Sequence, residues 1–183
     1  MKLIGLGANL TSRQFGPPRA TLGAALERLQ AHSIEISRRS PWYLSAPVPV
    51  SNQPWYVNGV ASVTTELSAD DLLKTLFMVE TSVGRVRSEP NAPRILDLDL
   101  LAYDQLSIEK TTTDGVHVSV PHPRMTDRAF VMLPLADIAP TWRHPTLAPS
   151  LTDFIEALPT EQSTEQMADA SGLFGTEWRN PDR

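Results

Sequence analysis

The sequence contains no cysteine, which excludes disulfides, thiol nucleophiles and metal sites built on cysteine ligands. No apolar run approaches the roughly 18 residues that a membrane-spanning helix needs, and the first residues lead into a glycine-containing turn rather than a signal peptide. The P-loop pattern G-x-x-x-x-G-K-[ST] is also absent. The 183 residues suit a single domain. We therefore expect a cytoplasmic protein that binds no membrane.

The sixteen basic residues are outnumbered by acidic ones, and only three of the sixteen are lysines. The net charge of −5 belongs wholly to residues 151–183, which contain seven acidic and two basic side chains. Because an acidic chain attracts nucleic acid poorly, we expect no nucleic-acid partner. The polar, glutamate-rich end also predicts a loosely ordered tail at residues 159–183, after a domain at residues 1–158.

Hydrophobic periodicity predicts the order strand, helix, strand, strand, helix, strand. The predicted strands are residues 2–7, 34–37, 56–67 and 94–103, and the predicted helices are residues 20–29 and the segment capped by Ser68. Residues 41–54 form a predicted proline-rich loop, and residues 151–158 a predicted closing helix. This order is typical of an α+β fold with a ferredoxin-like split βαβ arrangement. Helices would pack on one face of an antiparallel sheet and leave the other face for an active site.

Two aspartates two residues apart carry the strongest chemical signal. On a strand, Asp97 and Asp99 project to one side, and the leucines that alternate with them project to the core. Neighbouring carboxylates repel each other unless a cation lies between them. Mg²⁺ is commonly held by one or two carboxylates plus substrate phosphates. The pair therefore predicts a magnesium site, and the alternative is ordinary polar alternation on a half-exposed strand.

Arginines surround this pair in the sequence. Arg85 and Arg87 precede the predicted strand and share one side if their segment is extended. Arg94 begins the strand, and Arg128 lies beyond it. Arginines beside a carboxylate-bound Mg²⁺ neutralise and orient a polyphosphate. The cluster predicts a polyphosphate site, although each arginine alone is typical of a solvated surface.

The proline-rich loop leads into the strand that carries Tyr56 and Asn58. Its prolines fix φ and remove donors, so the remaining backbone groups are held rigid and presented. Tyr56 and Asn58 share a face of the strand, and an aromatic ring beside an amide suits a flat heteroaromatic ligand. The alternative is a rigid edge loop with a core tyrosine. Farther along, His122 between two prolines could donate to a phosphate or cap a turn.

Taken together, these segments resemble the 6-hydroxymethyl-7,8-dihydropterin pyrophosphokinases of folate biosynthesis over about residues 3–155. The segments that carry the resemblance are Gly5–Leu10, Gln53–Asn58, Glu80, Gly84–Arg87, Ala92–Leu101, Val120–Met125, Arg128–Phe130 and Pro134–Leu135. Members of this family transfer a diphosphoryl group from ATP to the hydroxymethyl oxygen of the pterin and release AMP.

The resemblance also implies roles for individual residues. Asp97 and Asp99 would hold two Mg²⁺ ions that bridge the triphosphate of the co-substrate ATP. Together with Arg85 and Arg94, which would contact the phosphates, they are the expected catalytic residues. The further ATP-binding residues would be Arg87, His122 and Arg128, with Leu73, Glu80 and Ser119 around the nucleoside end. Tyr56 and Phe130 would sandwich the hydroxymethyldihydropterin, and Asn58 with Ser45, Ala46, Pro47 and Val48 would read its amide edge.

Two other functions stay open on the sequence alone. One is a magnesium- and ATP-dependent phosphotransferase with another acceptor, and the other is a ferredoxin-like nucleotide-binding module without catalysis. Paired carboxylates argue against the binding module, since a binder has no need of them. Because the family is often monomeric, we expect a monomer.

Overall fold

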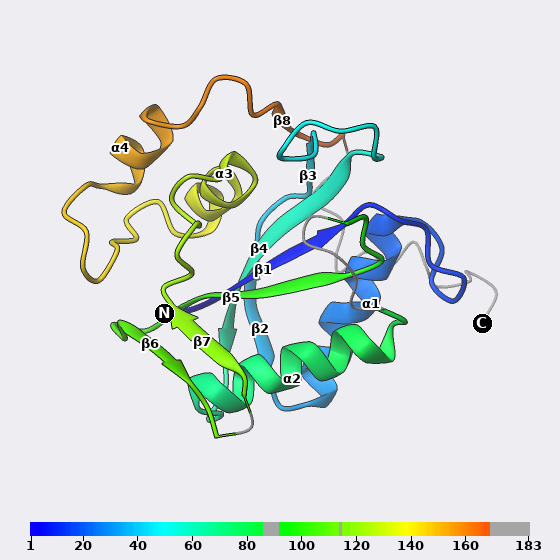
Figure 1. The fold of residues 1–183 in the computed structure, drawn as a ribbon, viewed down its shortest axis with the longest axis horizontal. Coiled ribbons are helices and arrows are strands. Elements are labelled where there is room, and N and C mark those ends of the chain that lie inside the picture. Colours follow the sequence, from blue (N-terminus) through cyan, green and yellow to red (C-terminus); the bar gives the residue numbers. More distant parts are fainter. Residues whose placement is uncertain (86–91, 114, 169–183) are drawn as a thin grey trace.

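The structure is a computed structural model in which residues 1–85, 92–113 and 115–168 are described (Figure 1). Its centre is an antiparallel sheet of six strands in the order β5-β1-β4-β3-β8, with β2 also paired to β4. These strands are β1 (Lys2–Ala8), β2 (Glu35–Arg39), β3 (Tyr43–Ser45), β4 (Tyr56–Thr64), β5 (Asp97–Tyr103) and β8 (Thr164–Gln166). A separate hairpin contains β6 (Ile108–Thr111) and β7 (His117–Val120).

Helices α1 (Pro18–Ala31) and α2 (Ala69–Ser82) pack together on one face of the sheet (Figure 1). The predicted apolar face of α1 is fully buried at Leu22, Leu26 and Leu29. Helix α2 begins where predicted, because the Ser68 side chain accepts a hydrogen bond from the N–H of Asp71. The two helices and the β5 residues Leu98 and Leu100 form one continuous apolar core.

Helices α3 (Ala129–Ile138) and α4 (Leu151–Glu156) lie on the opposite face (Figure 1). A second apolar cluster joins Leu3 and Leu101 of the sheet to Met132 and Leu135 of α3. The predicted α+β, ferredoxin-like fold is confirmed, and α3 adds a cover over part of the second face. The site lies beside α3 on that face.

The alternation of β5 follows the sequence prediction. Leu98 and Leu100 are 1% and 4% exposed and belong to the core on the side of α1 and α2. Asp97 and Asp99 occupy the other set of positions and keep part of their side chains exposed. The strand therefore divides a core from a polar surface within seven residues.

Several elements were not predicted. Strand β3 lies inside the segment predicted as a proline-rich loop, and the β6–β7 hairpin follows the aspartate strand. Strand β8 lies within the segment predicted as a loosely ordered tail and pairs with β3. Residues 169–183 of that tail lie outside the described residues. Across the parts of the chain that are described, no helix has the length and apolar character needed to cross a membrane.

Candidate active site

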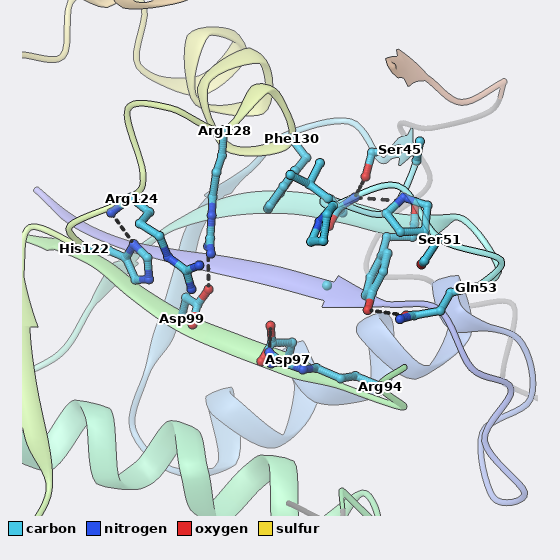
Figure 2. A pocket seen from close by; sticks show the side chains of 17 residues that line it. Ser45, Ser51, Gln53, Arg94, Asp97, Asp99, His122, Arg124, Arg128 and Phe130 are labelled. Atoms are coloured by element: carbon cyan, nitrogen blue, oxygen red, sulfur yellow. Dashed lines mark hydrogen bonds and ion pairs between the residues drawn. The ribbon is translucent and has the colours of Figure 1, made fainter. Parts of the chain in front are cut away.

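A pocket opens between β5, the end of β1, the loop after β3 and the start of α3 (Figure 2). The predicted site residues that line it are Ser45, Ala46, Pro47, Val48, Tyr56, Asn58, Arg94, Asp97, Asp99, His122, Arg128 and Phe130. They come from strands, loops and a helix that are distant in sequence. The fold therefore brings together most of the residues singled out by the sequence.

Asp97 lies between two arginines at one end of the pocket. Arg85 Nη1 is 2.9 Å from Asp97 Oδ1, and the guanidinium of Arg94 contacts Asp97 Oδ2. The backbone of Arg94 is held in turn by Asn9, whose side-chain oxygen accepts the Arg94 N–H at 2.7 Å. Asn9 directly follows the glycine-containing first strand, so this early motif fixes the arginine that precedes the aspartates.

Asp99 is the second carboxylate and faces Arg128, with 3.6 Å between Oδ2 and Nη1. Burial, reinforced by the negative charge of Asp97, raises the pKa of Asp99 above its ordinary value. A cation at this pair would remove that repulsion. No cluster of three or more His, Cys, Asp or Glu side chains that could hold a metal occurs in the described residues. Two carboxylates fit Mg²⁺, which takes its other ligands from water and substrate phosphates.

The other end of the pocket is a slot lined by aromatic and amide groups. Asn58 and Ser45 are 4% and 2% exposed, and Asn58 Nδ2 donates to Ser45 Oγ at 2.8 Å. The hydroxyl of Tyr56 donates to Gln53 Oε1 at 3.3 Å. Phe130 extends into the pocket from α3 (Figure 2). A flat ligand with a hydrogen-bonding edge would fit between these groups.

His122 lies between the pocket and the β6–β7 hairpin. Its Nδ1 accepts the N–H of Arg124 at 3.1 Å, which leaves Nε2 as the donor of a neutral ring. Burial lowers the pKa of His122 to about 4, and the charge of Arg128 acts in the same direction. The ring is therefore neutral at pH 7 and offers an N–H to an anion.

Some predicted residues do not line the pocket. Glu80 is buried behind β5, where it accepts the N–H of Leu98 at 2.7 Å and contacts Arg85. Burial raises the pKa of Glu80 to about 7. Leu73 belongs to α2 and is packed in the core, and Ser119 borders a separate hollow under the hairpin. Arg87 lies outside the described residues.

Sequence reasoning missed several residues that line the pocket: Gly7, Pro49, Ser51, Gln53 and Arg124. Arg124 is the most informative, because its guanidinium has no carboxylate partner among the described residues. It extends toward the Asp99 side of the pocket (Figure 2). The sequence feature that could have indicated Arg124 is its position directly after Pro123, two residues after His122.

Comparisons with known proteins show the family of this chain. The family model described as 7,8-dihydro-6-hydroxymethylpterin-pyrophosphokinase (HPPK) matches residues 3–140. The chain is 38% identical over 155 residues to the 2-amino-4-hydroxy-6-hydroxymethyldihydropteridine pyrophosphokinase of Synechocystis sp., covering 84% of this chain and 74% of that one. It is 38% identical over 159 residues to the protein of the same name from Pseudomonas aeruginosa, covering 86% and 91%.

Solved structures show the same fold. An HPPK-DHPS crystal structure from Plasmodium falciparum matches with a TM-score of 0.69 at 14% identity, over 85% of this chain and 43% of that one. This chain thus spans less than half of that solved chain. The family match and the two bacterial relatives together carry the assignment: the chain belongs to the 7,8-dihydro-6-hydroxymethylpterin-pyrophosphokinase family of enzymes, as its motifs predicted.

Proposed function

We propose that this chain transfers a diphosphoryl group from ATP to 6-hydroxymethyl-7,8-dihydropterin in folate biosynthesis. The hydroxymethyl oxygen of the pterin attacks the β-phosphorus of ATP and loses its proton. The bond between the β-phosphorus and the oxygen that bridges to the α-phosphorus breaks. AMP and the pterin diphosphate are the products.

One observation carries this proposal: a single pocket joins a carboxylate and arginine end to an aromatic and amide slot. Asp97 and Asp99 lie with Arg94 and Arg128 at the first end, and Tyr56 with Asn58 in the slot. A polyphosphate needs the first set, and a pterin needs the second. Because both sets line one pocket, the site suits a transfer between two bound substrates.

Each group of side chains has a proposed role that follows from its chemistry. Arg85, Arg94 and Arg128 neutralise the triphosphate and stabilise the charge that develops as the leaving group departs. His122, Arg87, Leu73, Glu80 and Ser119 are the remaining members of the proposed ATP site. Tyr56 and Phe130 stack on the pterin, while Asn58, Ser45 and the backbone of residues 46–48 recognise its amide edge. Holding both substrates in line converts a bimolecular step into one within the complex.

Asp97 and Asp99 are the residues that would hold magnesium, two ions by the family resemblance. There the metal would supply Lewis-acid chemistry, polarising the phosphoryl oxygens and neutralising charge on the reacting oxygens. The proposal includes a cytoplasmic monomer with a catalytic domain at residues 1–158, against which the first part of the predicted tail packs through β8.

The test is to incubate the protein with MgATP and 6-hydroxymethyl-7,8-dihydropterin and to resolve the nucleotides and pterins by chromatography. AMP formed in step with pterin diphosphate is the expected result. Formation of ADP, or of AMP without dependence on the pterin, would contradict the proposed acceptor and reaction. Tight binding of both substrates with no turnover would indicate a binding module.

A further inference from the structure

The segment after α4 contacts two walls of the pocket from outside. Strand β8 pairs with β3, with Thr164 opposite Ser45, and the N–H of Ala46 donates to the carbonyl of Ser163 at 3.0 Å. Ser45 and Ala46 line the pocket. This segment lies beyond residues 3–140, which the family model matches. Figure 1 shows it passing from α4 to the edge of the sheet next to β3.

Gln162, just before β8, connects this segment to the start of α3. Its Nε2 donates to the carbonyl of Asp127 at 2.7 Å, and its Oε1 accepts the N–H of Ala129 at 2.9 Å. The two bonds bracket Arg128 in the chain. One side chain therefore fixes the backbone on both sides of an arginine that lines the pocket.

The start of α3 needs this support because of its own sequence. The first N–H groups of a helix have no partner within it and are usually capped by a short polar side chain. Ser68 and Ser150 do this for α2 and α4. The N-cap residue of α3 is Arg128, which makes no capping bond, because a guanidinium has no acceptor. The capping position is occupied by a residue that faces Asp99, and Gln162 supplies the missing acceptor from a distant segment.

We propose that Gln162 is a positioning residue for the pocket. It holds the start of α3 so that Arg128 faces Asp99 and Phe130 lines the slot, while β8 holds the wall that carries Ser45. The other end of α3 is tied to β3 as well, since Tyr43 Oη donates to Asp137 Oδ2 at 2.7 Å. The roles of Arg128 and Phe130 in binding ATP and the pterin rest on the proposed function.

The test variant is Gln162→Met, which keeps the length of the side chain and removes both hydrogen bonds. We expect the KM for both substrates to rise about tenfold, because a shifted Arg128 and Phe130 weaken both halves of the pocket. Loss of folded protein lowers the measured rate but leaves KM unchanged, so KM separates positioning from a merely structural role. Amide hydrogen exchange at Ala129 should become faster in the same variant.

Two further variants complete the test. Thr164→Val is the matched control, because the Thr164 hydroxyl is buried without a hydrogen-bond partner in the described residues, so both KM values should stay as in the wild type. Gln162→Glu keeps an acceptor for Ala129 but loses the donor to the Asp127 carbonyl, so it should recover only part of the loss. Wild-type KM values in Gln162→Met, or an equal rise in Thr164→Val, would overturn the inference. A wild-type protein that forms no pterin diphosphate would overturn the proposed function instead. The affinity for a non-hydrolysable ATP analogue and the exchange at Ala129 would then decide the role of Gln162.

Discussion

The carboxylate of Glu80 accepts a hydrogen bond from the backbone N–H of Leu98 at 2.7 Å, at the point of β5 between the two aspartates. The same oxygen contacts Arg85, which lies 2.9 Å from Asp97. The Glu80 side chain is 1% exposed. Helix α2 therefore holds the acidic strand and one of its arginines from behind, on the side away from the pocket.

Replacing Glu80 with alanine should lower the free energy of unfolding by about 3 kcal/mol, because Leu98 N–H and Arg85 would both lose their acceptor. Glu80→Gln retains an acceptor for Leu98 and should cost less. Urea denaturation of both variants at pH 8 measures the difference. Equal stability of the alanine variant and the wild type would show that this buried contact contributes nothing.

The two aspartates should differ in what they contribute to stability. Asp99→Asn removes repulsion from a carboxyl whose pKa is raised by burial, so the free energy of unfolding should stay equal or increase. Asp97→Asn removes the carboxylate shared by Arg85 and Arg94, so it should lower the free energy of unfolding by about 1–2 kcal/mol. Both should reduce kcat about a hundredfold or more. Thermal or urea unfolding with steady-state kinetics tests this pair, and equal stability changes would contradict it.

The parts of the site that depend on local periodicity could be predicted from the sequence. The alternation around Asp97 and Asp99 predicted which side chains leave the core, and Ser68 predicted the start of α2. These predictions depend on residues within one strand or one turn, where sequence spacing determines the face.

Contacts between distant segments could not be predicted in this way. Gln162 and Ala129 are 33 residues apart, and Glu80 and Leu98 are 18 apart. Neither pair has a spacing that a helix or strand would bring together. The family resemblance put Glu80 among the ATP-binding residues, whereas its position behind β5 follows only from the packing of α2 on the sheet.

His122 should remain neutral well below pH 6, because burial lowers its pKa to about 4. In the unfolded chain its pKa is about 6.5, so between these values the unfolded state binds the proton first. Its contribution to stability is complete above pH 6.5 and is lost as the pH falls toward 4. Imidazole ¹⁵N spectra should show a neutral ring protonated on Nε2 at pH 6. Titration of the His122 ring near pH 6.5 in the folded protein would refute this prediction. His122→Asn should flatten the dependence of the free energy of unfolding on pH between about 4 and 6.5.

Arg124 should contribute to nucleotide binding although it was not expected from the sequence. It lines the pocket, and its charge lowers the pKa of both His122 and Arg128. Arg124→Ala should raise the KM for ATP about tenfold, since hydrogen bonds to charged groups are among the strong ones. The increase should shrink at high salt. Arg143→Ala, at an arginine outside the pocket, is the control, and an equal effect of both substitutions would indicate a general charge effect.

Gly7 should determine how deep the slot is. It lines the pocket and pairs with Asn58 on one side and Asp97 on the other. A Cβ at this position would lie 3.2 Å from Asn58 Oδ1, the amide oxygen expected to meet the pterin edge. Gly7→Ala should therefore raise the KM for the pterin about tenfold while the KM for ATP changes little.

Gly5→Ala is the comparison variant on the same face of β1. Its Cβ would meet Leu101 at an ordinary contact distance of 3.4 Å, and Gly5 pairs with Asp99 instead of Asp97 and is not among the residues that line the pocket. Alanine in a strand interior also loses less conformational entropy than glycine, so this variant should fold at least as well as the wild type. Steady-state kinetics with each substrate varied in turn compares the two enzymes. A pterin KM that is unchanged in Gly7→Ala would mean that the ligand lies away from Asn58, and the proposed recognition of its amide edge would then be wrong.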